Sequence, residues 1–143
     1  VFVTLVAARE PVSLDRLIEW SGVSASRQEV RRLLREDWRP WVVERQDPIR
    51  RTLYTLYHLS VKDFVMGKVD QRGLTITSLH VVDDLQAHLR VVQRRIVEYF
   101  HRQCNGDWSQ LAGQAYADRH LAYHLEQVQS QGTKPLWNVA LAR

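Results

Sequence analysis

The chain has 143 residues, of which 45% are hydrophobic and 25% charged, and its formal net charge is +4. These values are typical of a folded globular protein and exclude disordered and collagen-like classes. The longest apolar run, Val1 to Ala8, is far shorter than the roughly 18 residues that cross a bilayer. Because the lone Cys104 has no second cysteine with which to form an internal disulfide, we expect a cytoplasmic protein. The chain has no initiator methionine, and we expect it to be a piece of a larger protein.

The first 40 residues predict helices. Residues 1–8 form either a short helix or a buried strand, since periodicity cannot decide over so few residues. Ser13 is a suitable N-cap for a helix over residues 14–20, which Ser21-Gly22 ends. Ser26 and Glu29 have the spacing of a capping box and predict the start of the next helix. The residues of that helix expected to face the core are Val30, Leu33 and Leu34, and those expected to face outward are Arg27, Arg31, Arg32 and Arg35.

Two β-rich runs follow, over residues 41–45 and 52–57, separated by a polar segment that contains Asp47-Pro48. Proline fixes φ and aspartate bonds the backbone just beyond it, so this segment predicts the turn of a β-hairpin. Three helices followed by a hairpin indicate a mainly α fold with a winged-helix domain over residues 1–66, in which the hairpin is the wing.

Helical patterns continue beyond the wing. We expect Ser60 to cap a helix with Asp63 in its first turn, then a connection over residues 67–81 with a short strand at 74–76. A helical segment is expected over residues 82–129, because apolar residues recur there at three- and four-residue steps. Cys104 to Gly106 should end its first helix, and Asp107 should cap a second stretch that is interrupted near Gly113. Residues 130–143 are expected to begin a further, truncated element.

Catalytic motifs are missing from the sequence. It has no Gly-x-x-x-x-Gly-Lys-Ser/Thr, Gly-x-Gly-x-x-Gly, Gly-x-Ser-x-Gly or His-Glu-x-x-His, and Cys104 has no evident activating base. His120 and His124 are four residues apart, as in some metal sites, with Asp118 or Glu126 as further candidate ligands. Because further ligands are lacking, we favour the interpretation that both histidines pack at a helix interface. We therefore predict no metal site and no enzymatic activity for this segment.

Basic residues allow a nucleic-acid hypothesis, because a winged helix can place its third helix in the major groove and its wing on phosphates. The candidate residues are Arg27, Arg31, Arg32, Arg35, Arg45, Arg50 and Arg51. The positive charge of that helix is reduced by three acidic residues, Glu29, Glu36 and Asp37. Two tryptophans, Trp38 and Trp41, are more typical of contacts to an apolar partner than of phosphate binding. Nucleic-acid binding is accordingly the alternative and not the preferred function.

A histidine, His58, stands between the last strand of the wing and the start of the next helix. Amides at a helix start attract anions, which makes His58 a candidate ligand-binding residue. The simpler alternative is a capped junction with a half-buried histidine.

The segment Tyr57-His58-Leu59-Ser60-Val61-Lys62-Asp63-Phe64 is similar to the winged-helix signature of the STAND signalling NTPases, the NACHT and NB-ARC families. The segment from Tyr116 to Leu125 also resembles a helical region that often follows in that class. The resemblance implies that His58 contacts the β-phosphate of ADP in an inactive state, and that the P-loop and Walker acid of a parent NTPase lie upstream.

The same resemblance implies the partners. They are an upstream nucleotide-binding domain and a downstream repeat or sensor domain, with possible oligomerisation of the parent, and the fragment alone holds no cofactor. The competing functions are a winged-helix DNA-binding regulator and a scaffold whose His58 touches no ligand.

Overall fold

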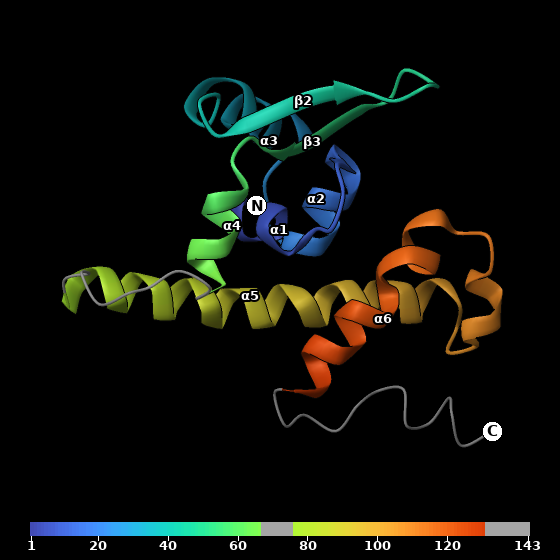
Figure 1. Ribbon diagram of the computed structural model, residues 1–143. Helices are drawn as coiled ribbons and strands as arrows, with labels where there is room; N and C mark the ends of the chain where they lie inside the picture. Colours follow the sequence, from blue (N-terminus) through green and yellow to red (C-terminus); the bar gives the residue numbers. More distant parts are fainter. Residues whose placement is uncertain (67–75, 131–143) are drawn as a thin grey trace. The chain divides into compact units, whose positions relative to one another are not determined.

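The computed structural model describes residues 1–66 and 76–130 (Figure 1). By its internal contacts the chain divides into two compact units, Val1–Leu89 and Arg90–Arg143. The division falls within one long helix, α5 (Ile76–Gln103). The predictions for residues 67–75 and 131–143 lie outside the described residues.

The first unit is mainly helical, with a small antiparallel sheet. Its elements in chain order are α1 (Phe2–Ala7), β1 (Val12–Ser13), α2 (Leu14–Ser21), α3 (Arg27–Arg32), a π-helical turn η1 (Leu33–Asp37), β2 (Val42–Gln46), β3 (Thr52–Leu56), α4 (Leu59–Val65) and the first part of α5. The helix α1 therefore occupies residues 2–7, which decides between the helix and the buried strand that the sequence left open for residues 1–8. The second unit contains the end of α5, a 3₁₀ turn η2 (Trp108–Leu111) and α6 (Ala115–Gln129).

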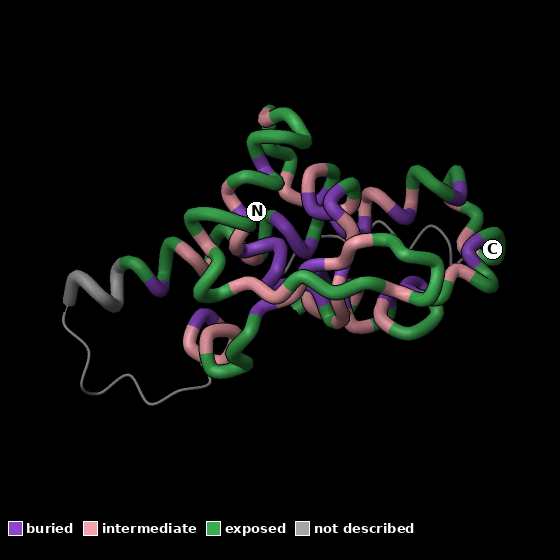
Figure 2. Tube along the Cα trace, turned by 90° about the horizontal axis from the view of Figure 1, so that it is seen from above, coloured by how far each residue is buried: buried purple, intermediate pink, exposed green. Residues whose placement is uncertain are grey.

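The sheet has the strand order β1-β3-β2, so β3 lies at its centre. Val12 of β1 is opposite Tyr54, and Val42 of β2 is opposite Leu56. Helices α1, α2 and α4 all contact β3. Tyr54 and Leu56 are correspondingly buried. All of α1 beyond Phe2 is buried as well, as the purple stretch that follows the N-terminus shows (Figure 2).

Local capping explains where several helices begin. The Ser13 side chain accepts a hydrogen bond from the amide of Arg16, as predicted for the start of α2. Ser26 and Glu29 form the predicted capping box, with Ser26 N donating to the Glu29 carboxylate at 2.7 Å. Gly22 ends α2 at φ 63, a left-handed conformation that glycine adopts without a side-chain clash.

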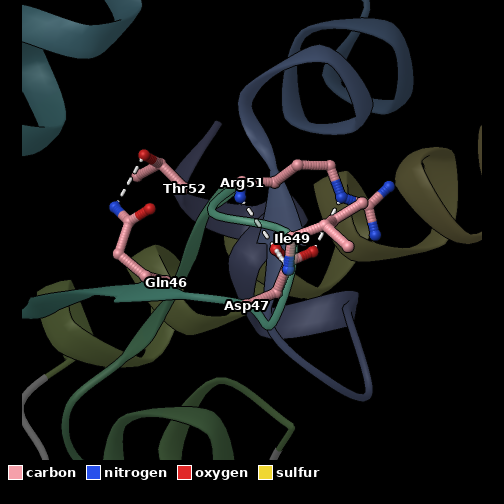
Figure 3. A network of polar contacts seen from close by, with 5 residues as sticks. All are labelled: Gln46, Asp47, Ile49, Arg51 and Thr52. Carbon is pink, nitrogen blue, oxygen red and sulfur yellow. Dashed lines mark hydrogen bonds and ion pairs between the residues drawn. The ribbon is translucent and has the colours of Figure 1, made fainter.

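The hairpin turn is held by Asp47, as predicted from Asp47-Pro48. One carboxylate oxygen accepts from the amides of Ile49 and Arg51 at 3.0 and 2.7 Å, and the other accepts from the Arg51 side chain at 2.7 Å (Figure 3). A bond from Gln46 to Thr52 joins the two strands next to the turn. These contacts hold the turn even though Arg50 has a φ of 61, which is unfavourable for a residue with a side chain.

Three details of the sequence prediction were wrong. The two-residue strand β1 was not expected, because it forms by pairing with β3, about 40 residues away in the chain. Helix α4 begins at Leu59 with His58 at the N-cap, so Ser60 lies inside the helix and does not cap it. Helix α5 already includes residues 76–81. The sequence had predicted that these residues belong to the connection and include the end of a short strand.

Other expectations about the helices are confirmed. Val30 and Leu34 are buried, whereas Leu33 is only half-buried, and the four arginines of this region are exposed. Asp107 caps η2 through the amide of Ser109, and the chain breaks between η2 and α6 near Gly113. Within the described ranges 1–66 and 76–130, no helix combines the length and apolar character needed to cross a membrane.

We predict that Asp47→Ala lowers the free energy of unfolding by about 1 kcal/mol, because two backbone amides and the Arg51 side chain lose their acceptor at an exposed turn. Denaturant unfolding of the whole chain measures the change. Asp37→Ala, which removes an exposed carboxylate outside the turn, is the matched control. Equal losses for the two variants would contradict the role of Asp47.

Candidate functional site

The candidate site is the junction between β3 and α4, which carries His58. The amide of Tyr57 donates to the carbonyl of Trp41 at 2.7 Å, so strand pairing continues one residue beyond β3. His58 then leaves the sheet as the N-cap of α4, with φ −106 and ψ 122. The histidine is therefore held directly between a paired strand and a helix.

Helix α4 is itself attached to α1. The Lys62 ammonium donates to the carbonyl of Ala8, just beyond α1, at 2.7 Å. Burial, together with the nearby charge of Arg9, lowers the pKa of Lys62 below its ordinary value. Val65 of α4 is buried as well. The backbone on both sides of His58 thus has fixed positions in the first unit.

The side chain of His58 is exposed. Its ring lies edge-on to that of Tyr57, with centroids 4.4 Å apart, and it makes no capping hydrogen bond. Tyr57 and Leu59 on either side are 64% and 73% exposed, so His58 lies within an exposed apolar segment. An exposed imidazole with N–H donor capacity can bind an anion from outside the chain.

The arginines of the nucleic-acid hypothesis are partly engaged within the chain. Arg27 forms an ion pair with Asp15, Arg35 with Glu44, and Arg51 with Asp47. The positive charge available to phosphates is correspondingly smaller than the sequence alone indicates.

Of the two tryptophans expected to act as apolar anchors, Trp38 is half-buried and meets the ring of Phe2 at 5.6 Å. Trp41 is 50% exposed, so about half of its surface faces solvent.

The second unit contains a buried polar cluster that consists of Gln93, Tyr116 and His124. The Gln93 amide oxygen faces His124 Nδ1, and the Tyr116 hydroxyl lies 2.9 Å from His124 Nε2. An amide oxygen only accepts, so Nδ1 carries the proton, and in the neutral imidazole Nε2 accepts from the hydroxyl. Both ring nitrogens are engaged, which leaves neither lone pair for a metal.

Aromatic stacking surrounds this cluster. The Tyr116 ring stacks on Phe100 at 6.0 Å and on His124 at 5.8 Å, while the half-buried His120 meets it edge-on at 5.0 Å. The geometry supports the packing interpretation of His120 and His124. No group of three or more potential metal ligands occurs in the part of the chain that the structure describes.

Gln93 was missed by the sequence analysis, although a signal was present. It lies four residues after Leu89 and seven before Phe100, which places a polar side chain on the apolar face of α5. Such a residue must find a polar partner when it is buried.

Cys104 is buried at the end of α5, where its thiol donates to the carbonyl of His101. Nucleophilic chemistry needs an accessible sulfur, and Cys104 has no exposed surface.

Comparison with known proteins adds no relative: no family model, curated protein or solved structure matches the chain.

We predict that His124→Leu lowers the free energy of unfolding of the second unit by about 3 kcal/mol, because the buried Tyr116 hydroxyl and Gln93 amide lose their partner. His120→Leu changes a half-buried ring with the same substitution and should cost much less. Adding Gln93→Leu to His124→Leu should recover part of the loss, since one orphaned polar group is then removed. Denaturant unfolding measures all three, and a His120→Leu loss as large as that of His124→Leu would argue against the cluster.

Proposed function

We propose that residues 1–66 form a winged helix. The element order α1-β1-α2-α3-β2-β3 and the sheet order β1-β3-β2 support this assignment. The hairpin β2-β3 is the wing in this proposal, and α4 is the helix into which the wing leads.

We further propose that the chain is the regulatory winged-helix and helical segment of a STAND-type nucleotide-dependent switch. The observation that carries this proposal is the exposed imidazole of His58 at the anchored junction between the wing and α4. In the intact parent, His58 donates a hydrogen bond to the β-phosphate of ADP, which is bound mainly by an upstream nucleotide-binding domain. The helices α5 and α6 connect the switch to a downstream sensor.

The physical basis of the switch is differential binding. A contact that exists only in the closed state stabilises that state over the open one by its own free energy. Hydrogen bonds to charged groups are worth about 1.5–3 kcal/mol, which corresponds to roughly a ten- to hundredfold change in nucleotide retention. A single histidine is therefore sufficient to bias the equilibrium.

We predict that His58→Ala in the full-length parent weakens ADP retention about tenfold or more and raises signalling output. Dissociation of a fluorescent ADP analogue and an output assay measure the two effects. His58→Gln keeps an N–H donor and should retain part of the affinity. His88→Ala, which removes an exposed histidine from α5, is the control. Unchanged ADP retention and unchanged output in His58→Ala would contradict the proposal.

The alternative is a winged-helix DNA-binding regulator, favoured by Arg31 and Arg32, which are exposed on the last turn of α3. It predicts that this chain binds duplex DNA at low salt and loses affinity when both arginines become glutamine. Fluorescence anisotropy across a salt series measures this. The absence of binding at low salt would exclude the alternative, and a double variant with unchanged affinity would exclude α3 as the DNA-binding element.

A further inference from the structure

A cavity of about 360 Å³ lies in the first unit where the end of α3 and η1 meets the hairpin. Its volume is near the lower end of the roughly 300–1,000 Å³ that small-molecule sites occupy. His58 is not among its lining residues, so a ligand here is independent of the function proposed above.

The cavity has an apolar side formed by Leu34 of η1 and by Val42 and Val43 of β2. Leu34 is buried and the two valines are half-buried, so a ligand bound there would remove further apolar surface from water. Tyr54 of β3, which is only 2% exposed, completes the lining from the central strand.

The polar side is formed by Arg35, Arg39 and Glu44. Arg35 donates from Nε and Nη2 to the two carboxylate oxygens of Glu44, at 2.9 and 2.8 Å. Those hydrogen bonds lower the pKa of Glu44 and, with a contribution from Tyr54, raise that of Arg35. Arg35 and Glu44 neutralise each other. The lining therefore carries one net positive charge, which is that of Arg39.

The backbone at this place is unusual. The amide of Trp38 donates to the carbonyl of Leu33 at 2.9 Å, five residues back, so the end of the helix widens into a π-helical turn. This turn contains Leu34 and Arg35, and it leads directly to Arg39. π-Helical turns are rare and frequently occur at functional sites.

We propose that this cavity binds a small carboxylate with a compact apolar body. The carboxylate pairs with Arg39, and the apolar body lies against Leu34, Val42 and Val43. The fixed Arg35–Glu44 pair forms the neutral polar wall beside them. A single net positive charge favours a monoanion over a cation, and the apolar side favours an organic acid over an inorganic anion.

Benzoate is a suitable probe, and benzylamine is its counterpart with the same ring and the opposite charge. Titration of the ¹⁵N-labelled chain should give saturable shifts of the Val42, Val43 and Glu44 amides with benzoate. For so small a ligand the dissociation constant should be on the order of millimolar. Benzylamine and inorganic phosphate should bind at least about tenfold more weakly. Benzylamine lacks the negative charge that pairs with Arg39, and phosphate lacks the apolar ring.

Two variants test the two sides of the cavity. Arg39→Gln should weaken benzoate binding about tenfold, while Arg50→Gln, a matched change at the hairpin tip, should leave it unchanged. Val43→Phe should reduce binding with Arg39 intact, because the larger side chain fills the apolar space. Thermal unfolding confirms that each variant is folded.

The proposal is overturned if benzoate gives no saturable shifts, or if benzylamine binds as tightly as benzoate. Equal benzoate affinity in Arg39→Gln and the unaltered chain would also overturn it. None of these outcomes bears on ADP retention by His58, so the two proposals fail separately.

Discussion

Pairing of β3 on both of its edges is the constraint on which the first unit depends. This strand bonds to β1 on one side and to β2 on the other, and it contacts α1, α2 and α4. Its two buried side chains, Tyr54 and Leu56, therefore connect elements that are far apart in the chain. Shifting β3 by one residue would turn both side chains to the opposite face and disrupt the core.

The position of β3 determines two surface features, the His58 junction and the cavity beside η1. The strand ends one residue before Tyr57, whose amide remains bonded to Trp41, and this places His58 at the start of α4. Tyr54, on the same strand, reaches the cavity beside η1. The middle of this short strand thus contributes to the cavity lining, and its C-terminal end positions the histidine junction.

How much the sequence predicts depends on how local the deciding interaction is. The caps by Ser13, Ser26 and Asp107 were predicted because a side chain bonds an amide two or three residues away. The Asp47 turn was predicted for the same reason. Strand β1 was missed because two residues carry no pattern of their own and need β3 as a partner. The start of α4 was misplaced because tertiary pairing at Tyr57, and not the hydroxyl of Ser60, determines where the helix begins.

The candidate site was predicted in part. His58 could be selected from its position after the hairpin, but its exposure and the Lys62 bond to Ala8 depend on the packing of α4 and α1. The π-helical turn at Leu33 could not be predicted, because the pattern of Val30 and Leu34 fits a regular helix equally well. The cavity beside that turn was therefore also beyond the sequence analysis.

The two outer strands of the sheet have a consequence for self-association. An outer strand has unpaired backbone groups that can recruit a strand from another molecule. Strand β1 is only two residues long, and β2 carries the exposed charged residues Glu44 and Arg45 on the other edge. A short edge and a charged edge both oppose intermolecular strand addition. The central strand is paired along its whole length by β2 and over two residues by β1.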